Sequence, residues 1–272
     1  KSAKIFSDLV ERFAAPWWTA AMQNNYNALF GESDSVFIKR YFSKRSVPTS
    51  TTVSASPFEE DIFQNTAEAT LKFDPGWNAY IPTAFSNRNA LMEDMAVILA
   101  PTDKAMSDWW WGEGSGKLLR TRYGGSERLE NVPSTVVAEL LNNNFLEQLT
   151  LSLPSKFNET VYDDANEIMG LDTAMISAVS IGCNGAVYYT DMVYEPASFR
   201  SVLYPVVVNS DATTNVIYNI IDQLDYKAYL NSMVSRYSFF YPTNKGLLTY
   251  IDPVSYGKQN RELWTFEYDP TA

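Results

Sequence analysis

The chain has 272 residues, of which 46% are hydrophobic and 14% aromatic, enough apolar mass for one large domain or for one and a half ordinary ones. A formal charge of −11 argues against the basic face that nucleic acids require, and the sequence contains no run of about eighteen apolar residues that would indicate a transmembrane helix. The chain has no histidine and a single cysteine, which excludes Ser-His-Asp and Cys-His catalysis, His-containing zinc sites and an intrachain disulfide.

The N-terminal part of the chain is predicted to hold helix, strand and loop in turn. Apolar residues at helical spacing predict a helix over residues 5–29, which Pro16 divides into two pieces. Gly31 is a typical helix stop, and residues 35–42 predict a strand. Residues 46–57 are rich in serine, threonine and proline, which favours a loop.

A strand followed at once by a helix is predicted near residue 100. Residues 95–99 form a short apolar run that predicts a buried strand. Pro101 ends it, because proline lacks the N–H that a sheet ladder uses. Thr102 or Asp103 can cap the helix that follows, and the tryptophans at 109–111 close that helix.

The remainder of the chain shows both helical and strand-like spacing of its apolar residues. Helices are predicted over residues 136–151 and 216–234. Asn184-Gly185 is a strong hairpin signal between two strands. Short strands are predicted over residues 160–163, 175–181, 186–189 and 201–208.

One short motif occurs twice. Residues 100–106 (Ala-Pro-Thr-Asp-Lys-Ala-Met) recur as residues 241–247 (Tyr-Pro-Thr-Asn-Lys-Gly-Leu), and Pro101 and Pro242 are 141 residues apart. Each copy follows an apolar run and precedes a predicted helix. A repeat at the length of an ordinary domain indicates tandem domains rather than a solenoid, whose units recur every ~20–50 residues.

These motifs resemble the fasciclin (FAS1) family. An apolar strand ending in Ala-Pro-Thr-Asp is the first signature of that family, and residues 184–196 (Asn-Gly-Ala-Val-Tyr-Tyr-Thr-Asp-Met-Val-Tyr-Glu-Pro) are similar to its second. The two signatures stand in the family's order. The resemblance covers residues 93–208 well and residues 211–250 in part, and it extends to the multi-FAS1 surface lipoproteins of Gram-negative gut bacteria.

The resemblance implies an α+β fold, namely a FAS1-like wedge of two small β-sheets with packed helices. We expect residues 1–210 to form a FAS1-like domain with an enlarged N-terminal part. Residues 211–272 are then the incomplete start of a second FAS1-like domain.

The function implied by the resemblance is that of a non-enzymatic cell-surface binding or adhesion module, and in the narrower comparison an accessory lipoprotein of an outer-membrane nutrient-uptake complex. The expected partner is a protein or a surface glycan, and no cofactor and no metal are expected. The expected location is the cell surface or outer membrane, through a lipid anchor outside this chain, or the periplasm.

Two other functions stay open at this stage. Tandem domains also suit a structural spacer in a surface array. A carboxylate-dependent glycan hydrolase needs two acids facing one cleft, and the spacing of the 32 acidic residues does not single out a pair.

Five aromatic residues are the binding candidates. Successive residues on a helix point 100° apart, so Trp109, Trp110 and Trp111 cannot all face one core. An exposed tryptophan is a common anchor for partners, although packing against residues 1–30 explains the triplet as well. Tyr188 and Tyr189 are the other candidates. Many family members carry histidine at the position of Tyr188. Because tyrosine replaces that titratable group here, the resemblance does not imply a pH-dependent role for this chain.

The remaining polar candidates are expected to be structural. The helix caps predicted in the two motif copies are Thr102 and Asp103 in the first copy and Thr243 and Asn244 in the second, each contributing ~1 kcal/mol. Asn184 and Asp191 are predicted to bond backbone in turns, and Cys183 to be a small core residue. The acidic run at 163–167 lacks the spacing of a calcium loop and is predicted to be a solvated charge cluster.

Overall fold

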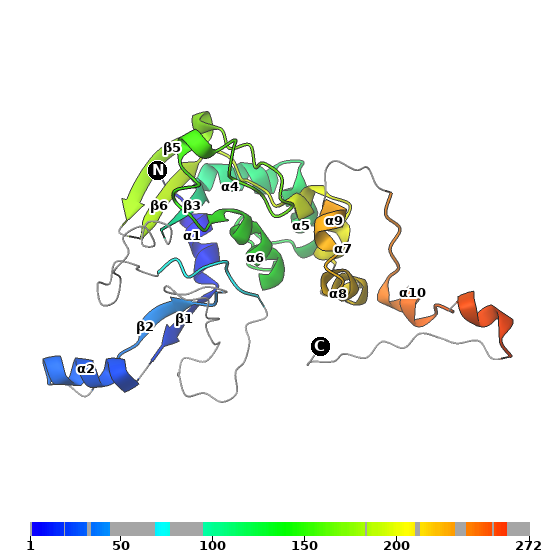
Figure 1. Ribbon diagram of the computed structural model, residues 1–272, viewed down its shortest axis with the longest axis horizontal. Coiled ribbons are helices and arrows are strands. Elements are labelled where there is room, and N and C mark those ends of the chain that lie inside the picture. Colours follow the sequence, from blue (N-terminus) through cyan, green and yellow to red (C-terminus); the bar gives the residue numbers. More distant parts are fainter. Residues whose placement is uncertain are drawn as a thin grey trace. The chain divides into compact units, whose positions relative to one another are not determined.

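The computed structural model describes residues 2–18, 20–31, 34–43, 69–76, 95–182, 184–209, 213–231, 238–251 and 253–259. Within them the fold is α+β, and the chain divides into two compact units (Figure 1). Unit 1 comprises Lys1–Asp163 and Glu167–Glu195, and unit 2 comprises Asp164–Asn166 and Pro196–Ala272. The FAS1-like boundaries at residues 1–210 and 211–272 stay a prediction, as does the FAS1 form of the fold.

Unit 1 begins with two helices and two strands that alternate along the chain. These elements are α1 (Lys4–Glu11), β1 (Ala14–Trp17), α2 (Ala20–Phe30) and β2 (Ile38–Tyr41). The predicted division of the helix over residues 5–29 at Pro16 is confirmed, but the break is a strand rather than a kink, because Pro16 lies in β1, which pairs antiparallel with β2. A two-stranded ribbon tolerates proline, since its missing N–H can face the unpaired side. Gly31 ends α2 with a φ of +66°, as predicted.

Unit 1 contains a four-stranded mixed sheet, of which β3, β5 and β6 are labelled in Figure 1. Its strands are β3 (Ala96–Pro101), β4 (Phe145–Leu146), β5 (Ile176–Gly182) and β6 (Gly185–Thr190), in the order β4-β3-β6-β5. β3 and β6 run parallel, and the other pairs are antiparallel. The predicted Asn184-Gly185 hairpin is confirmed, because Gly182 of β5 pairs with Gly185 of β6.

Gly185 is needed where β6 meets β3. It pairs with Ala96 and has a φ of +154°, which L side chains rarely adopt. A Cβ at this position would lie 2.0 Å from the carbonyl oxygen of Ala96. Only glycine therefore allows the hairpin to begin beside β3.

Among its described residues, unit 1 has three further α-helices, namely α4 (Asp103–Trp111), α5 (Ser115–Tyr123) and α6 (Ser134–Asn143). α1 packs against α4, α6 and β3. The helix predicted over residues 136–151 ends early, because Phe145 and Leu146 leave it to pair with β3 as β4. That pairing encloses both side chains in the core.

The two faces of the sheet bury different residues. Val97 pairs with Ala186 and Leu99 with Tyr188, so these side chains share one face. That face belongs to a core cluster of Val97, Leu99, Leu146, Phe157, Val161, Leu171, Ala186, Tyr188 and Tyr194. On the other face Phe145 stacks on Phe73, with ring centroids 4.8 Å apart.

Unit 2 is helical over its described residues. Its α-helices there are α7 (Tyr204–Val208), α8 (Asn215–Gln223), α9 (Lys227–Asn231) and α10 (Asn244–Leu248). The strand predicted over residues 201–208 is wrong, because α7 occupies this valine-rich run and Pro205 fits its first turn. The helix predicted over residues 216–234 stops at Gln223, near Asp225 with its φ of +57°.

Several predictions fall on other residues. The loop at 46–57, Cys183 and the end of the helix predicted to reach residue 234 lie outside the described residues. The apolar run before the second motif copy, residues 237–240, is not a strand in its described part, residues 238–240.

Candidate functional site

The first copy of the repeated motif joins two helices of unit 1. Thr102 caps α4, where its Oγ1 accepts a hydrogen bond from the N–H of Ala105 at 3.3 Å. The carboxylate of Asp103 accepts a hydrogen bond from the N–H of Ile5 at 2.8 Å, in the first turn of α1. The N–H of Asp103 in turn donates to the carbonyl of Ser2 at 2.9 Å. Asp103 therefore caps α1 from a different part of the chain.

The second copy makes the same bonds in unit 2. Thr243 caps α10 by accepting from the N–H of Gly246 at 3.3 Å. Asn244 Oδ1 accepts from the N–H of Val216 at 3.3 Å, in the first turn of α8. The N–H of Asn244 donates to the carbonyl of Thr213 at 2.8 Å.

We call this arrangement the helix clamp. In each copy, threonine caps the helix that follows, and the next residue caps a helix earlier in the chain. The predicted capping roles are thus confirmed, and the acid or amide has a second partner that the sequence did not reveal. Because these polar groups bond to backbone, the motif is a folding element and does not itself form a binding site.

The tryptophan triplet ends α4, and its three side chains have different surroundings. Trp110 is wholly enclosed, Trp109 is half-buried and Trp111 is 56% exposed. The expectation that the three indoles cannot share one core is confirmed. Trp110 is removed from the binding candidates, because its ring reaches no surface.

Trp109 is held inside a small polar cluster. Its Nε1 donates to the carboxylate of Glu195 and to Ser115 Oγ, the latter at 3.0 Å, and Ser115 Oγ also donates to Glu195. α5 can come this close because Gly116 has no side chain, since a Cβ there would lie 2.4 Å from the Trp109 carbonyl oxygen. These bonds make Trp109 a positioned structural residue whose ring is partly accessible.

Two buried asparagines fix the segment that carries Glu195. The carboxamide nitrogens of Asn143 and Asn144 donate to the carbonyl oxygen of Tyr194, at 3.1 and 2.9 Å. Both asparagines lie at the end of α6 and are fully buried. They therefore anchor the chain immediately before Glu195.

Trp111 is the tryptophan that faces solvent. The guanidinium of Arg120 lies over its ring, 5.2 Å from the centroid, and its Nε1 donates to the carboxylate of Glu127 at 3.3 Å. Arg120 also donates to the carbonyl oxygen of Trp110. A cation over the ring and an acceptor at its edge hold the exposed indole in one orientation. We call Trp111, Arg120 and Glu127 the Trp111 surface.

The two tyrosine candidates are also separated. Tyr188 is buried, and its ring meets Phe157 edge to face at a centroid distance of 5.7 Å. Burial raises the pKa of the Tyr188 phenol, so it stays neutral at physiological pH. Tyr188 is therefore removed from the binding candidates, whereas Tyr189 is half-buried and stays partly accessible.

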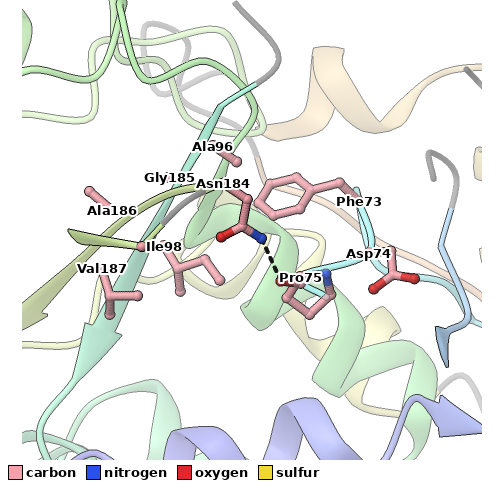
Figure 2. Close-up of a pocket in the computed structure, with 10 residues that line it drawn as sticks. Phe73, Asp74, Pro75, Ala96, Ile98, Asn184, Gly185, Ala186 and Val187 are labelled. Atoms are coloured by element: carbon pink, nitrogen blue, oxygen red, sulfur yellow. Dashed lines mark hydrogen bonds between the residues drawn. The ribbon is translucent and has the colours of Figure 1, made fainter. Parts of the chain in front are cut away.

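A cavity of about 90 Å³ lies where the β5–β6 hairpin begins (Figure 2). It is lined by Phe73, Asp74, Pro75, Ala96, Ile98, Gly182, Asn184, Gly185, Ala186 and Val187. Asn184 closes one side by donating from Nδ2 to the Pro75 carbonyl at 3.2 Å, and the Asp74 carboxylate accepts from the N–H of Gly76 at 2.8 Å. Ligand pockets usually measure about 300–1,000 Å³, so this cavity is too small for a sugar ring or a cofactor.

A second, more open hollow of about 250 Å³ includes Lys72, Glu147 and Tyr162 in its lining. Glu147 is the one carboxylate in that lining, and Asp74 is the one in the cavity of Figure 2. Neither of these two hollows therefore presents the pair of acids that glycoside hydrolysis needs.

The acidic run at residues 163–167 forms a turn. The N–H of Glu167 donates to Asp163 Oδ1 at 3.0 Å, and Asn166 has a φ of +60°. Among the described residues, no group of three histidine, cysteine or acidic side chains is arranged to hold a metal ion. No helix in the described part of the chain is both long and apolar enough to cross a bilayer.

The chain matches no protein-family model, no curated protein and no solved structure. The geometry of the surfaces is therefore the main guide to function.

The residues that sequence reasoning missed are those surrounding the tryptophans. Ser115 and Arg120 lie in α5, and Glu127 lies in the loop after it, but no sequence motif marks these three residues. Glu195 lies 86 residues from Trp109 in sequence, a separation that periodicity does not bridge.

Proposed function

We propose that the chain is a non-enzymatic binding module of an exported cell-surface protein, which contacts a protein partner or a surface glycan through the Trp111 surface. The observation that carries this proposal is the exposed indole of Trp111, held by Arg120 and Glu127. Tryptophan and arginine are the residues most enriched among interface hot spots. A side chain already held in its bound orientation loses less conformational entropy when a partner arrives.

The resemblance to the FAS1 family supports the same class of function. The first signature and residues 184–195 of the second lie in unit 1, and the helix clamp of the first signature recurs in unit 2. In this proposal the chain belongs to a multi-FAS1 surface lipoprotein, anchored outside this segment, that acts as an accessory component of an outer-membrane nutrient-uptake complex. It needs no cofactor.

Replacement of Trp111 tests the proposal. We expect Trp111→Ala to lose at least about thirtyfold in binding, since a truncated hot spot costs ≥ 2 kcal/mol. The probes are a glycan array and detergent-solubilised outer membranes from the source cells. Leu118→Ala is the matched control, because Leu118 is an exposed apolar residue on the neighbouring helix α5. Equal binding by the two variants, with normal folding, would remove the Trp111 surface from the function.

A structural spacer is the second candidate function, and the duplicated helix clamp favours it. Two units that each contain the same clamp suit a tandem array that holds other domains at a distance. Unchanged binding by Trp111→Ala in a folded protein would favour the spacer over the binding module.

A further inference from the structure

The two edges of the four-stranded sheet differ in how they are protected. β4, at one edge, is two residues long, and both residues are buried. β5, at the other edge, is seven residues long, and its residues 179–182 are exposed. A short, buried edge strand offers no template for another chain, whereas a long exposed one does.

The exposed half of β5, residues 179–182, has none of the usual features that block edge pairing. The sequence of the whole strand, Ile-Ser-Ala-Val-Ser-Ile-Gly, has no charged residue and no proline. Its pairing with β6 is irregular only between Ile176 and Ala178, at the start of the strand. Charges, proline and bulges are the devices that keep natural sheet edges apart. The exposed half of β5 therefore remains regular and uncharged.

Two apolar side chains of β5 lie on the core face of the sheet but are exposed at its edge. Val179 pairs with Tyr188, and Ile181 pairs with Ala186, so both lie on the face of the sheet that carries the core cluster. Yet Val179 is 52% exposed and Ile181 is 82% exposed. Large β-branched residues in register with the core, but uncovered, are typical of a sheet that continues into another strand.

We propose that β5 pairs antiparallel with β5 of a second copy of this chain, about a twofold axis at Ser180, joining the two sheets into one. This register places Val179 opposite Ile181 of the second copy, on the same face, so apolar β-branched side chains meet across the axis. Two copies of Ser180 meet at the centre. The strand is thus complementary to itself in shape and in chemistry.

The charge distribution favours a second copy at this place. Each chain carries −11, so contact between most pairs of surfaces adds like-charge repulsion. β5 carries no charge, so edge-to-edge pairing brings no two carboxylates directly opposite each other. A strand pair buries less area than a standard interface, so the dimer is weak and depends on concentration. The proposal goes beyond the binding role of Trp111 and does not depend on it.

Sedimentation of the whole chain tests self-pairing. We expect the wild-type chain to pass from monomer to dimer as its concentration rises from about 1 µM to about 1 mM, and Ile181→Lys to stay monomeric throughout. Ile168→Lys is the matched control, since Ile168 is also an exposed isoleucine of unit 1 but lies outside β5, and it should dimerise like the wild type. A monomeric wild type at the highest concentration, or equal dimerisation of Ile181→Lys, overturns the proposal.

A disulfide reports the register. In a Cys183→Ser background, Ser180→Cys should cross-link to a dimer under mild oxidation, because the two β-carbons face each other at the axis. Ser177→Cys should cross-link far more slowly, since residue 177 has no copy of itself opposite. Equal rates for the two variants overturn the twofold register. A monomeric wild type that instead captures an extended peptide at β5 shows that a foreign strand is the occupant.

Discussion

The two copies of the helix clamp make the same hydrogen bonds in surroundings that bury very different amounts of apolar surface. In unit 1, α1 encloses Ile5 and Leu9 in the core. In unit 2, the corresponding Val216 and Ile220 of α8 are half-buried. The clamp is therefore a local device that keeps its geometry with or without a full core. Burial, rather than hydrogen bonding, is what distinguishes the stability expected for the two copies.

The largest difference in stability between the two units is expected on truncation of the apolar residue four positions after each threonine. Met106 is wholly enclosed, whereas Leu247 is 8% exposed. We expect Met106→Ala to destabilise unit 1 by about 3–4 kcal/mol and Leu247→Ala to destabilise unit 2 by about 2 kcal/mol, because a better enclosed site leaves a larger cavity. Native-state hydrogen exchange, read separately for amides of each unit, measures both. Equal losses would show that the two clamps are equally enclosed in solution.

A smaller effect is expected from the residue that caps the earlier helix. Asp103→Ala leaves the N–H of Ile5 without its acceptor and should cost about 1–2 kcal/mol, and Asn244→Ala should cost about 0.5–1 kcal/mol, because its bond is longer and neutral. Faster exchange confined to the Ile5 amide in the first variant and to the Val216 amide in the second is the expected signature. Asp103→Asn, which converts the first clamp to the chemistry of the second, should restore most of the protection. Unchanged exchange at Ile5 would exclude the cap.

The smallest effect is expected in the dependence of stability on acid pH. A titratable group supports α1, whereas the clamp residue that caps α8 does not titrate. Glu11, in the last turn of α1, accepts hydrogen bonds from Lys39 Nζ at 2.9 Å and from the Tyr41 hydroxyl at 2.8 Å. These bonds, that of Lys39 first, hold the pKa of Glu11 below its ordinary value of 4.5. A lowered pKa stabilises the fold above pH 4.5, and this stabilisation is lost as the pH falls through the folded-state pKa.

Glu11→Gln should therefore be less stable than the wild type at neutral pH, and the difference should vanish in acid. Urea unfolding of both chains from about pH 3 to about pH 7 measures this convergence. The carboxamide of Asn244 does not titrate in this range, so Asn244→Ala should cost the same at each pH. A Glu11→Gln difference that is constant with pH would contradict the assignment.

Elements set by local sequence were largely predictable. β3 and the helix after it follow from an apolar run, a proline and a capping threonine, all adjacent in sequence. α7 was mistaken for a strand because consecutive valines favour strands, whereas in the fold Val206, Val207 and Val208 are all buried around a single helical turn. Propensity was overridden there by the burial of three consecutive valines.

Contacts between distant residues could not be predicted. The 100° rotation between helix residues required that the three tryptophans differ in exposure, but not that Trp110 would be the enclosed one. That outcome depends on α5, which approaches α4 at Gly116, and on α1, which packs against α4. The partner of Asp103 likewise lies 98 residues away, near the N-terminal end of unit 1, where no motif marks it.

The helix clamp also bears on the order in which the chain folds. Asp103 and Ile5 are 98 residues apart, whereas Asn244 and Val216 are 28 residues apart. Loop closure costs entropy that grows with the logarithm of loop length, so the first clamp costs roughly 1 kcal/mol more to close than the second. In refolding from denaturant, the C-terminal clamp should close first. During synthesis the N-terminal clamp leaves the ribosome first, so the same bonds form in the opposite order.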